Sequence, residues 1–157
     1  QILKTLGAEV FGPPGTTRNG VKVLRRYLDT LSLDRNSYTL VDGSGLSPQN
    51  RLSPHQIVQV LRHVQKNLSI FPEFIAALGV MGVDGNVKRR MNGLDDAQRV
   101  RVKTGTLKGV SALSGFFQSK NKELFAFSIL MNDLRCHNGK AWSIQDQIVR
   151  EGLRFQR

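Results

Sequence analysis

Lys103, Thr104, Gly105 and Thr106 form a Lys-Thr-Gly-Thr run in the middle of the stretch "RVRVKTGTLKGVSALSGFF", which begins at Arg99. Apolar residues alternate with other residues before the run, as in a β-strand, and glycines punctuate the residues after it. The run can form the charged and hydroxylated edge of an active site or the solvated face of an edge strand. It is not a phosphate-binding loop, because no Gly-x-x-x-x-Gly precedes the lysine. Taken alone, the triplet favours the solvated edge, so the rest of the chain must decide.

The other reactive side chains indicate no disulfide and no metal. Cys136 is the single cysteine, which excludes an internal disulfide. His55 and His63 lie eight residues apart on one predicted helix, too far for a ligand pair. We therefore interpret Cys136 and its neighbour His137 as loop residues without chemical consequence.

Length and charge limit the classes of protein. A chain of 157 residues, 39% hydrophobic, is the size of one domain with a real core. No window approaches 18 consecutive apolar residues, and the first residues do not resemble an export signal. The net charge of +11 and a pI of about 10.5 favour an anionic partner: nucleic acid, a membrane surface or a cell wall.

Helical periodicity predicts the elements that position the run. A first helix is expected to stop at Gly7, and a second begins at Thr16 or Thr17. Ser53 and Pro54 begin a third, a fourth starts at Pro72, and a closing helix covers about 141–155. The predicted core-facing residues of the second, third and closing helices are Val21, Leu24, Leu28, Leu31; Ile57, Leu61, Val64, Leu68; and Ile144, Ile148, Leu153.

Alternating apolar residues predict the strands. A short strand is expected over 38–41, and three closely spaced strands over 100–106, 111–118 and 123–131. The last reads "LFAFSILM", which is apolar on both faces and so predicts a strand covered on both sides. Residues 82–98 have no sustained period and many turn formers, so we expect a long surface loop there.

The order of these segments resembles a known family. "VKTGTLKGVSALSGFF" is similar to the third motif of penicillin-binding proteins and serine β-lactamases. Before it, "VDGSGLS", "QNRLSP", a helix and "GVDGNVKRR" follow one another as in the low-molecular-mass, class C D-alanyl-D-alanine carboxypeptidases/endopeptidases of the penicillin-binding protein 4 type, peptidase S13. The resemblance covers the chain from Ile2 onward. It implies an α+β fold, a β-lactamase/transpeptidase-like antiparallel sheet flanked by helices, with residues 1–157 as the C-terminal part of that domain.

The resemblance also implies roles for the residues of the Lys-Thr-Gly strand. A substrate peptide would lie beside the strand as an added strand and hydrogen-bond to its backbone. Lys103 would supply positive charge and a proton-network contact, and the Thr104 hydroxyl would bind the substrate's terminal carboxylate. Gly105 would leave room for the substrate backbone. The Thr106 N–H would form half of an oxyanion hole, and Leu107 would line an apolar wall.

A second segment, "DGSGLSPQN", is similar to the family loop that receives the substrate side chain. Ser44 takes the position of a polar contact there. The family commonly has an arginine directly after the second serine, to grip the polar end of a diaminopimelate-type side chain, but this chain has Pro48. The nearby Arg51 either compensates or leaves that specificity reduced.

Two motifs of the family are absent from their expected places: a Ser-x-x-Lys at a helix start, and a Ser-x-Asn on a neighbouring loop. Ser119 to Lys122 has the first spacing but falls in a predicted hairpin turn. We therefore expect this chain to be the C-terminal part of a longer enzyme, with both motifs and the export signal upstream, and to be inactive alone.

These observations together predict part of a serine-type D-Ala-D-Ala carboxypeptidase/endopeptidase in the periplasm or cell envelope. Its expected partners are peptidoglycan stem peptides and, in the complete enzyme, β-lactams, with no cofactor and no nucleic acid. Two alternatives stay open: a catalytically inactive wall-binding module, and a basic nucleic-acid-binding domain. Against the second, aromatic residues make up only 7% of the chain and do not alternate with Lys and Arg as a base-stacking surface would.

Overall fold

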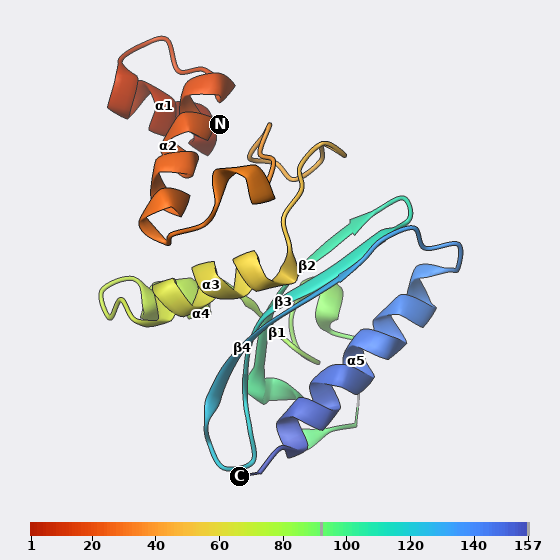
Figure 1. Ribbon diagram of the computed structural model, residues 1–157. Helices are drawn as coiled ribbons and strands as arrows, with labels where there is room; N and C mark the ends of the chain where they lie inside the picture. Colours follow the sequence, from red (N-terminus) through yellow and green to blue (C-terminus); the bar gives the residue numbers. More distant parts are fainter. Residues whose placement is uncertain (92, 157) are drawn as a thin grey trace. The chain divides into compact units, whose positions relative to one another are not determined.

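The computed structural model describes residues 1–91 and 93–156 and divides the chain into two compact units, Gln1–Val60 and Leu61–Arg157 (Figure 1). Each unit has its own cluster of buried apolar side chains. Asn92, within the loop predicted over 82–98, lies outside the described residues. No helix in the described part of the chain combines the length and hydropathy needed to cross a membrane.

Two closely packed helices begin the first unit: α1, Ile2–Phe11, and α2, Thr17–Thr30. Thr16 caps α2 as predicted, and its hydroxyl accepts the N–H of Asn19 at 3.1 Å. The predicted end of the first helix at Gly7 is wrong. Gly7 is buried inside α1, where an added Cβ would lie 2.7 Å from the backbone nitrogen of Gly20. This glycine allows the helices to approach each other and does not end one.

The strand predicted over 38–41 is also wrong. After the 3₁₀ turn η1, Arg35–Ser37, Thr39 and Arg51 form a single antiparallel bridge with two backbone hydrogen bonds of 2.9 and 2.8 Å. The pairing stops there because the Asn50 side chain takes over: its Oδ1 accepts the Val41 N–H at 2.8 Å. Buried side chains beside this bridge include Leu28, Leu33 and Tyr38.

Helix α3, Pro54–Gln65, begins at the predicted cap. The Ser53 hydroxyl accepts the Gln56 N–H at 3.2 Å, and Gln56 Oε1 accepts the Ser53 N–H at 2.8 Å, so the two residues cap the helix reciprocally. The helix ends at Gln65, and Leu68, predicted to continue its apolar face, is 84% exposed. That prediction is wrong because the Asn67 side chain accepts the Ser69 N–H at 3.1 Å and starts a turn.

The second unit is built on one antiparallel sheet in the order β1-β2-β3-β4 (Figure 1). Its strands are β1, Gly79–Val80; β2, Val100–Leu107; β3, Val110–Gln118; and β4, Leu124–Met131. The three predicted strands are confirmed within two residues at each end, and β1 was not predicted. A Cβ at Gly115 would lie 2.0 Å from the Arg101 carbonyl oxygen, so this glycine allows β3 to approach β2.

Helices cover the sheet on both faces. Helix α5, Asn138–Arg154, lies along one face, where Val149 and Leu153 belong to the same buried cluster as Leu113 of β3. On the other face, Phe71 and Phe74 of α4, Phe71–Ala76, meet the fully buried ring of Phe116 edge-on. The predicted α+β class is confirmed.

The closing helix faces the sheet with a different set of residues from the one predicted. Ile144 and Ile148 are 47% and 51% exposed, so their predicted packing against the sheet is wrong, whereas the predicted burial of Leu153 is confirmed. The buried positions recur every four residues: Ala141, Gln145, Val149 and Leu153. The prediction failed because one of these positions holds a polar glutamine, which breaks the apolar pattern.

The segment predicted as a surface loop over 82–98 contributes to the core. Val87, Met91 and Ala97 are buried with Met81 in the cluster beneath α5. Two short 3₁₀ turns, η2, Gly85–Val87, and η3, Asp95–Arg99, fold this segment onto the sheet. Such short turns leave no sustained period in the sequence, so the pattern resembled a solvated loop.

Strand β4 is only partly covered in this chain. All eight of its residues are partly exposed, although its sequence predicts burial on both faces. Among the described residues β4 pairs with β3 alone, which makes it an edge of the sheet.

Candidate active site

The Lys-Thr-Gly-Thr run lies in β2, beyond the part of that strand that β1 covers. Strand β1 pairs only with Arg101 and Val102, whereas β3 pairs with every residue from Val100 to Leu107. Among the described residues, no strand adjoins the other edge of 103–107. The predicted site residues of this run therefore lie together along one open edge of the sheet.

Strand alternation determines which backbone groups face the open edge. The Val100 carbonyl accepts the Met81 N–H at 3.1 Å, so the backbone groups of Val100 point toward the β1 side. Backbone groups return to the same side every second residue, and the pairing with β3 is unbroken up to Leu107. The N–H and C=O groups of Thr104 and Thr106 therefore point away from β3, toward the open edge.

The side chains of the run leave that edge accessible. Lys103 is exposed, and its Nζ donates to the Thr104 carbonyl at 2.8 Å, which holds its positive charge at the edge. Among the described residues, a Cβ added at Gly105 would meet one atom within 4 Å, the Ala112 Cβ at 3.4 Å, so little covers the face of the sheet at this glycine. Thr104 and Leu107 are half-buried.

A hollow of about 520 Å³ adjoins the end of β2. Thr106 and Leu107 line it from the strand, and the segment before α5 lines it from the opposite side. The two sides are joined by the Leu134 N–H, which donates to the Gly109 carbonyl at 2.9 Å. The hollow can accept an anionic group, because Lys108 and Arg135 bring positive charge to its wall.

His137 was dismissed from the sequence, but it has a structural role beside this hollow. Its Nδ1 accepts the Gly139 N–H at 3.2 Å and caps the start of α5. Cys136 is exposed and also lines the hollow. No sequence signal placed this pair beside β2, because the contact that links its loop to the β2–β3 turn is a backbone hydrogen bond between Leu134 and Gly109, far apart in the sequence.

The Ser119–Lys122 segment forms the turn between β3 and β4, as predicted. The Ser119 side chain is fully buried, and its hydroxyl accepts the Glu123 N–H at 3.3 Å. Lys122 has a left-handed backbone with φ of 63°. The same turn also contains a Ser-x-Asn spacing, from Ser119 to Asn121, which overlaps the Ser-x-x-Lys spacing. Neither spacing lies on a helix here, and the buried serine hydroxyl already has a partner.

Ser44 belongs to the first unit, in a loop organised by Asp42. The Asp42 carboxylate accepts four hydrogen bonds: from Asn50 Nδ2 at 2.7 Å, the N–H groups of Gly45 and Ser47 at 3.0 Å each, and the Ser44 hydroxyl at 3.2 Å. These donors hold the pKa of Asp42 below its ordinary value, Asn50 most strongly, although partial burial opposes them. The Ser44 hydroxyl is exposed but engaged inside its own loop. Pro48 and Arg51 are exposed.

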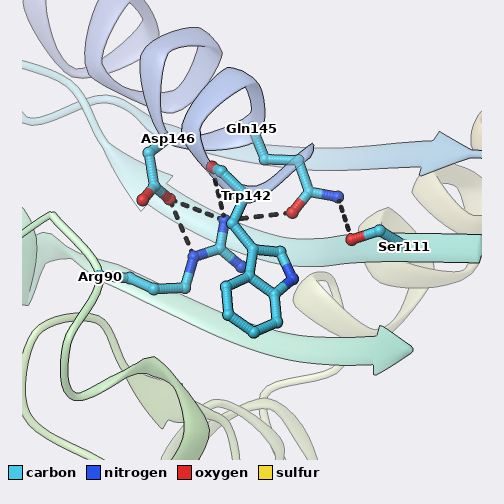
Figure 2. Close-up of polar contacts among 5 residues, drawn as sticks. All are labelled: Arg90, Ser111, Trp142, Gln145 and Asp146. Carbon is cyan, nitrogen blue, oxygen red and sulfur yellow. Dashed lines mark hydrogen bonds and ion pairs between the residues drawn. The ribbon is translucent and has the colours of Figure 1, made fainter. Parts of the chain in front are cut away.

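A buried cation lies behind the sheet (Figure 2). Arg90 is 6% exposed and pairs with Asp146 of α5, with nitrogen–oxygen distances of 3.0 and 2.7 Å. The same guanidinium donates to Gln145 Oε1 and to the Trp142 carbonyl. This group was not predicted, because Arg90 falls in the segment 82–98 that we expected to be a surface loop.

Comparison with known proteins identifies the family. Residues 1–152 match the D-Ala-D-Ala carboxypeptidase 3 (S13) family. The chain belongs to this family. The chain is 35% identical over 154 residues to the D-alanyl-D-alanine carboxypeptidase of Actinomadura sp. (strain R39), which covers 94% of this chain and 28% of that protein. It is 28% identical over 134 residues to the D-alanyl-D-alanine carboxypeptidase DacB of Haemophilus influenzae, with 83% of this chain and 28% of that protein covered.

Solved structures agree on the fold of this S13 chain. The crystal structure of penicillin binding protein 4 (dacB) from Haemophilus influenzae matches with a TM-score of 0.87 and 23% identity, over 98% of this chain and 36% of that one. The Bd0816 predatory endopeptidase from Bdellovibrio bacteriovorus matches with a TM-score of 0.68 and 19% identity, over 97% of this chain and 42% of that one. The S13 chain thus spans about a quarter to two fifths of the length of these relatives.

Proposed function

We propose that this chain supplies the Lys-Thr-Gly wall of the active site in a serine-type D-Ala-D-Ala carboxypeptidase/endopeptidase acting on peptidoglycan peptides. One observation carries the proposal: in a member of the S13 family, the run lies on a strand edge that the described chain leaves open, with two backbone N–H groups facing outward. A peptide added to that edge would find the donors that β-strand addition requires.

In the proposed complex, the substrate extends the sheet beside β2. The Thr104 hydroxyl and the charge of Lys103 bind its terminal carboxylate, and Gly105 leaves space for its backbone. The Thr106 N–H donates to the oxygen of the scissile carbonyl as negative charge develops there. Leu107 borders the leaving residue with apolar surface.

The reaction itself requires a nucleophile that we place elsewhere in the complete protein. A serine hydroxyl attacks the carbonyl carbon, its proton passes through a base to the leaving amine, and the terminal D-Ala departs. Water then hydrolyses the resulting ester. A β-lactam acylates the same serine and stays bound as an ester, which makes penicillin a direct probe of the site.

The Asp42 loop is proposed to receive the substrate side chain, with Ser44 as one polar contact. The proposed location is the periplasm or cell envelope, where peptidoglycan lies. The net charge of +11 suits an anionic wall.

A fluorescent penicillin tests the proposal. The complete protein is expected to form one covalent adduct per chain, on a serine outside residues 1–157, whereas this chain alone is expected to form none. Mass spectrometry of the intact protein and of its peptides measures both. A complete protein that binds peptidoglycan fragments but forms no adduct would indicate an inactive wall-binding module, and an adduct on Ser119 would contradict the account.

A further inference from the structure

We infer that Gln145 and Arg90 are positioning residues, which act through Ser111 to hold the β2 backbone at Thr106, where the proposed oxyanion donor lies (Figure 2). The inference rests on the proposed function of the β2 edge. The inference assigns a role in positioning β2, the strand of the Lys-Thr-Gly run, to residues that lie on the face of the sheet opposite to α4.

Ser111 of β3 lies directly across from Thr106 of β2. Because the backbone groups of Thr106 face the open edge, this is a non-hydrogen-bonded pair, the kind in which the two Cα atoms approach most closely, about 4.5 Å. The ladder bonds belong to the neighbouring pairs, Gly105 with Ala112 and Leu107 with Val110. Thr106 lies between these two bonded pairs, with Ser111 as its partner across the ladder, so a shift of Ser111 would also displace Thr106.

Gln145 fixes Ser111 from the helix. Its Nε2 donates to the Ser111 Oγ at 3.1 Å, and the two residues are 0% and 1% exposed. Gln145 occupies the middle of the buried face of α5, where an apolar residue would pack without a directional bond. A buried amide is costly unless both of its ends are bonded, so this glutamine sets the distance between α5 and β3 at Ser111.

Arg90 determines which way the Gln145 amide points. Its Nη2 donates to Gln145 Oε1 at 3.1 Å, and a guanidinium has donors only. The oxygen of the amide must therefore face Arg90, and its NH₂ group must face Ser111. Asp146 and the Trp142 carbonyl fix Arg90 in turn.

This arrangement matters for catalysis because an oxyanion donor works only at the right place. A donor N–H must lie about 3 Å from the developing oxyanion, and a misplacement of about 1 Å can reduce a rate a hundredfold. The carboxylate-binding groups, Lys103 and Thr104, lie farther along the strand. Loss of the Gln145–Ser111 bond should therefore affect the chemical step more than binding.

The test uses Ser111→Ala and Gln145→Met in the complete protein, with a D-Ala-D-Ala peptide as substrate. Each variant is expected to lower kcat about tenfold, with KM within about twofold of the wild-type value and the protein still folded by circular dichroism. The double variant should be no slower than the slower single variant, because both remove one shared bond. Ser111→Ala removes a single oxygen atom, so it tests the bond with the smallest change in packing, and a wild-type kcat in either single variant contradicts the inference.

Ser128→Ala is the matched control. It also removes a hydroxyl–hydroxyl bond within the sheet, 2.9 Å to the Ser114 Oγ, but this bond is half-buried and starts from β4, one strand farther from β2. We expect its kcat to stay at the wild-type value. Equal kcat losses in Ser111→Ala and Ser128→Ala, an unchanged kcat in either Ser111→Ala or Gln145→Met, or a rise in KM at constant kcat would overturn the inference. A wild-type protein that neither cleaves the peptide nor reacts with penicillin would instead refute the proposed function.

Discussion

The open edge of β2 and the Asp42 loop are both proposed to contact substrate, yet they are held in different ways. Eight residue pairs with β3 fix the backbone of β2, and the buried Arg90–Gln145–Ser111 group supports the strand from behind. In the loop, the Asp42 carboxylate accepts four hydrogen bonds, one of them from the Asn50 amide. The oxygen of that amide accepts the Val41 N–H. The geometry of the strand is thus shared among many contacts, whereas that of the loop depends on a single charge.

The difference matches the work proposed for each element. An oxyanion donor must keep its position to within a fraction of an ångström, and a paired strand does so whatever the pH. A loop that accepts a side chain tolerates more movement, and one charged residue is enough to shape it. The two elements should therefore fail under different changes.

The largest expected effect is on stability, from the group behind the strand. Arg90→Met should lower the free energy of unfolding by roughly 3–5 kcal/mol, because it leaves the Asp146 carboxylate and the Gln145 amide oxygen without the guanidinium that donates to both. Urea unfolding, followed through the fluorescence of the single tryptophan, Trp142, measures it. Arg99→Met is the control: its ion pair with Asp96 is largely exposed, at 41% and 51%, and should contribute at most about 1 kcal/mol. Equal losses in the two variants would show that the buried group contributes no more than a surface pair.

The next effect is on activity and concerns the edge itself. In the complete protein, Thr104→Val should slow acylation by penicillin about tenfold while the melting temperature stays unchanged, because it keeps the branched shape and removes one hydroxyl bond to a charged group. Stopped-flow or quenched acylation measures this rate. Thr39→Val, another exchange in extended backbone, controls for the loss of a hydroxyl as such. Equal acylation rates in all three proteins would mean that the run is only an edge of the sheet.

The smallest effect should be confined to the loop and should depend on pH. The pKa of Asp42 lies below its ordinary value, so the carboxylate stabilises the loop fully above that ordinary value. This contribution is lost as the pH falls through the ordinary value toward the lower pKa of the folded loop. The protection of the Gly45 and Ser47 amides, which is the intrinsic exchange rate at each pH divided by the observed rate, should fall over that interval, and Asp42→Asn should show low protection at every pH. A loss of protection in the variant over the same pH interval as in the wild type would mean that another group shapes the loop.

The sequence predicted the elements that follow simple periods. The three long strands, the cap of α2 and the Ser53 cap of α3 were all found, because their signals lie within a few residues. The family resemblance, carried by the Lys-Thr-Gly strand and the segments before it, was confirmed by the S13 match over residues 1–152. The roles of the individual site residues stay predictions.

The errors arose where distant contacts override local pattern. Gly7 resembles a helix end, but contact with α2 requires it inside α1. Residues 82–98 resemble a loop, but their turns bury apolar side chains that no regular period reveals. The polar Gln145 concealed the buried face of α5, because its two partners come from elements 34 and 55 residues away in the sequence.

Amide hydrogen exchange along β2, measured by NMR, tests the central claim most directly. In this chain, the N–H groups of Thr104 and Thr106 should exchange fast because they face the open edge, and those of Lys103 and Gly105 should exchange slowly because β3 accepts them. In the complete protein, acylation by penicillin should slow exchange at Thr106 while Gly105 stays as it was. Slow exchange at Thr106 before acylation, or fast exchange there after it, would contradict the account of β2 as the wall of the active site.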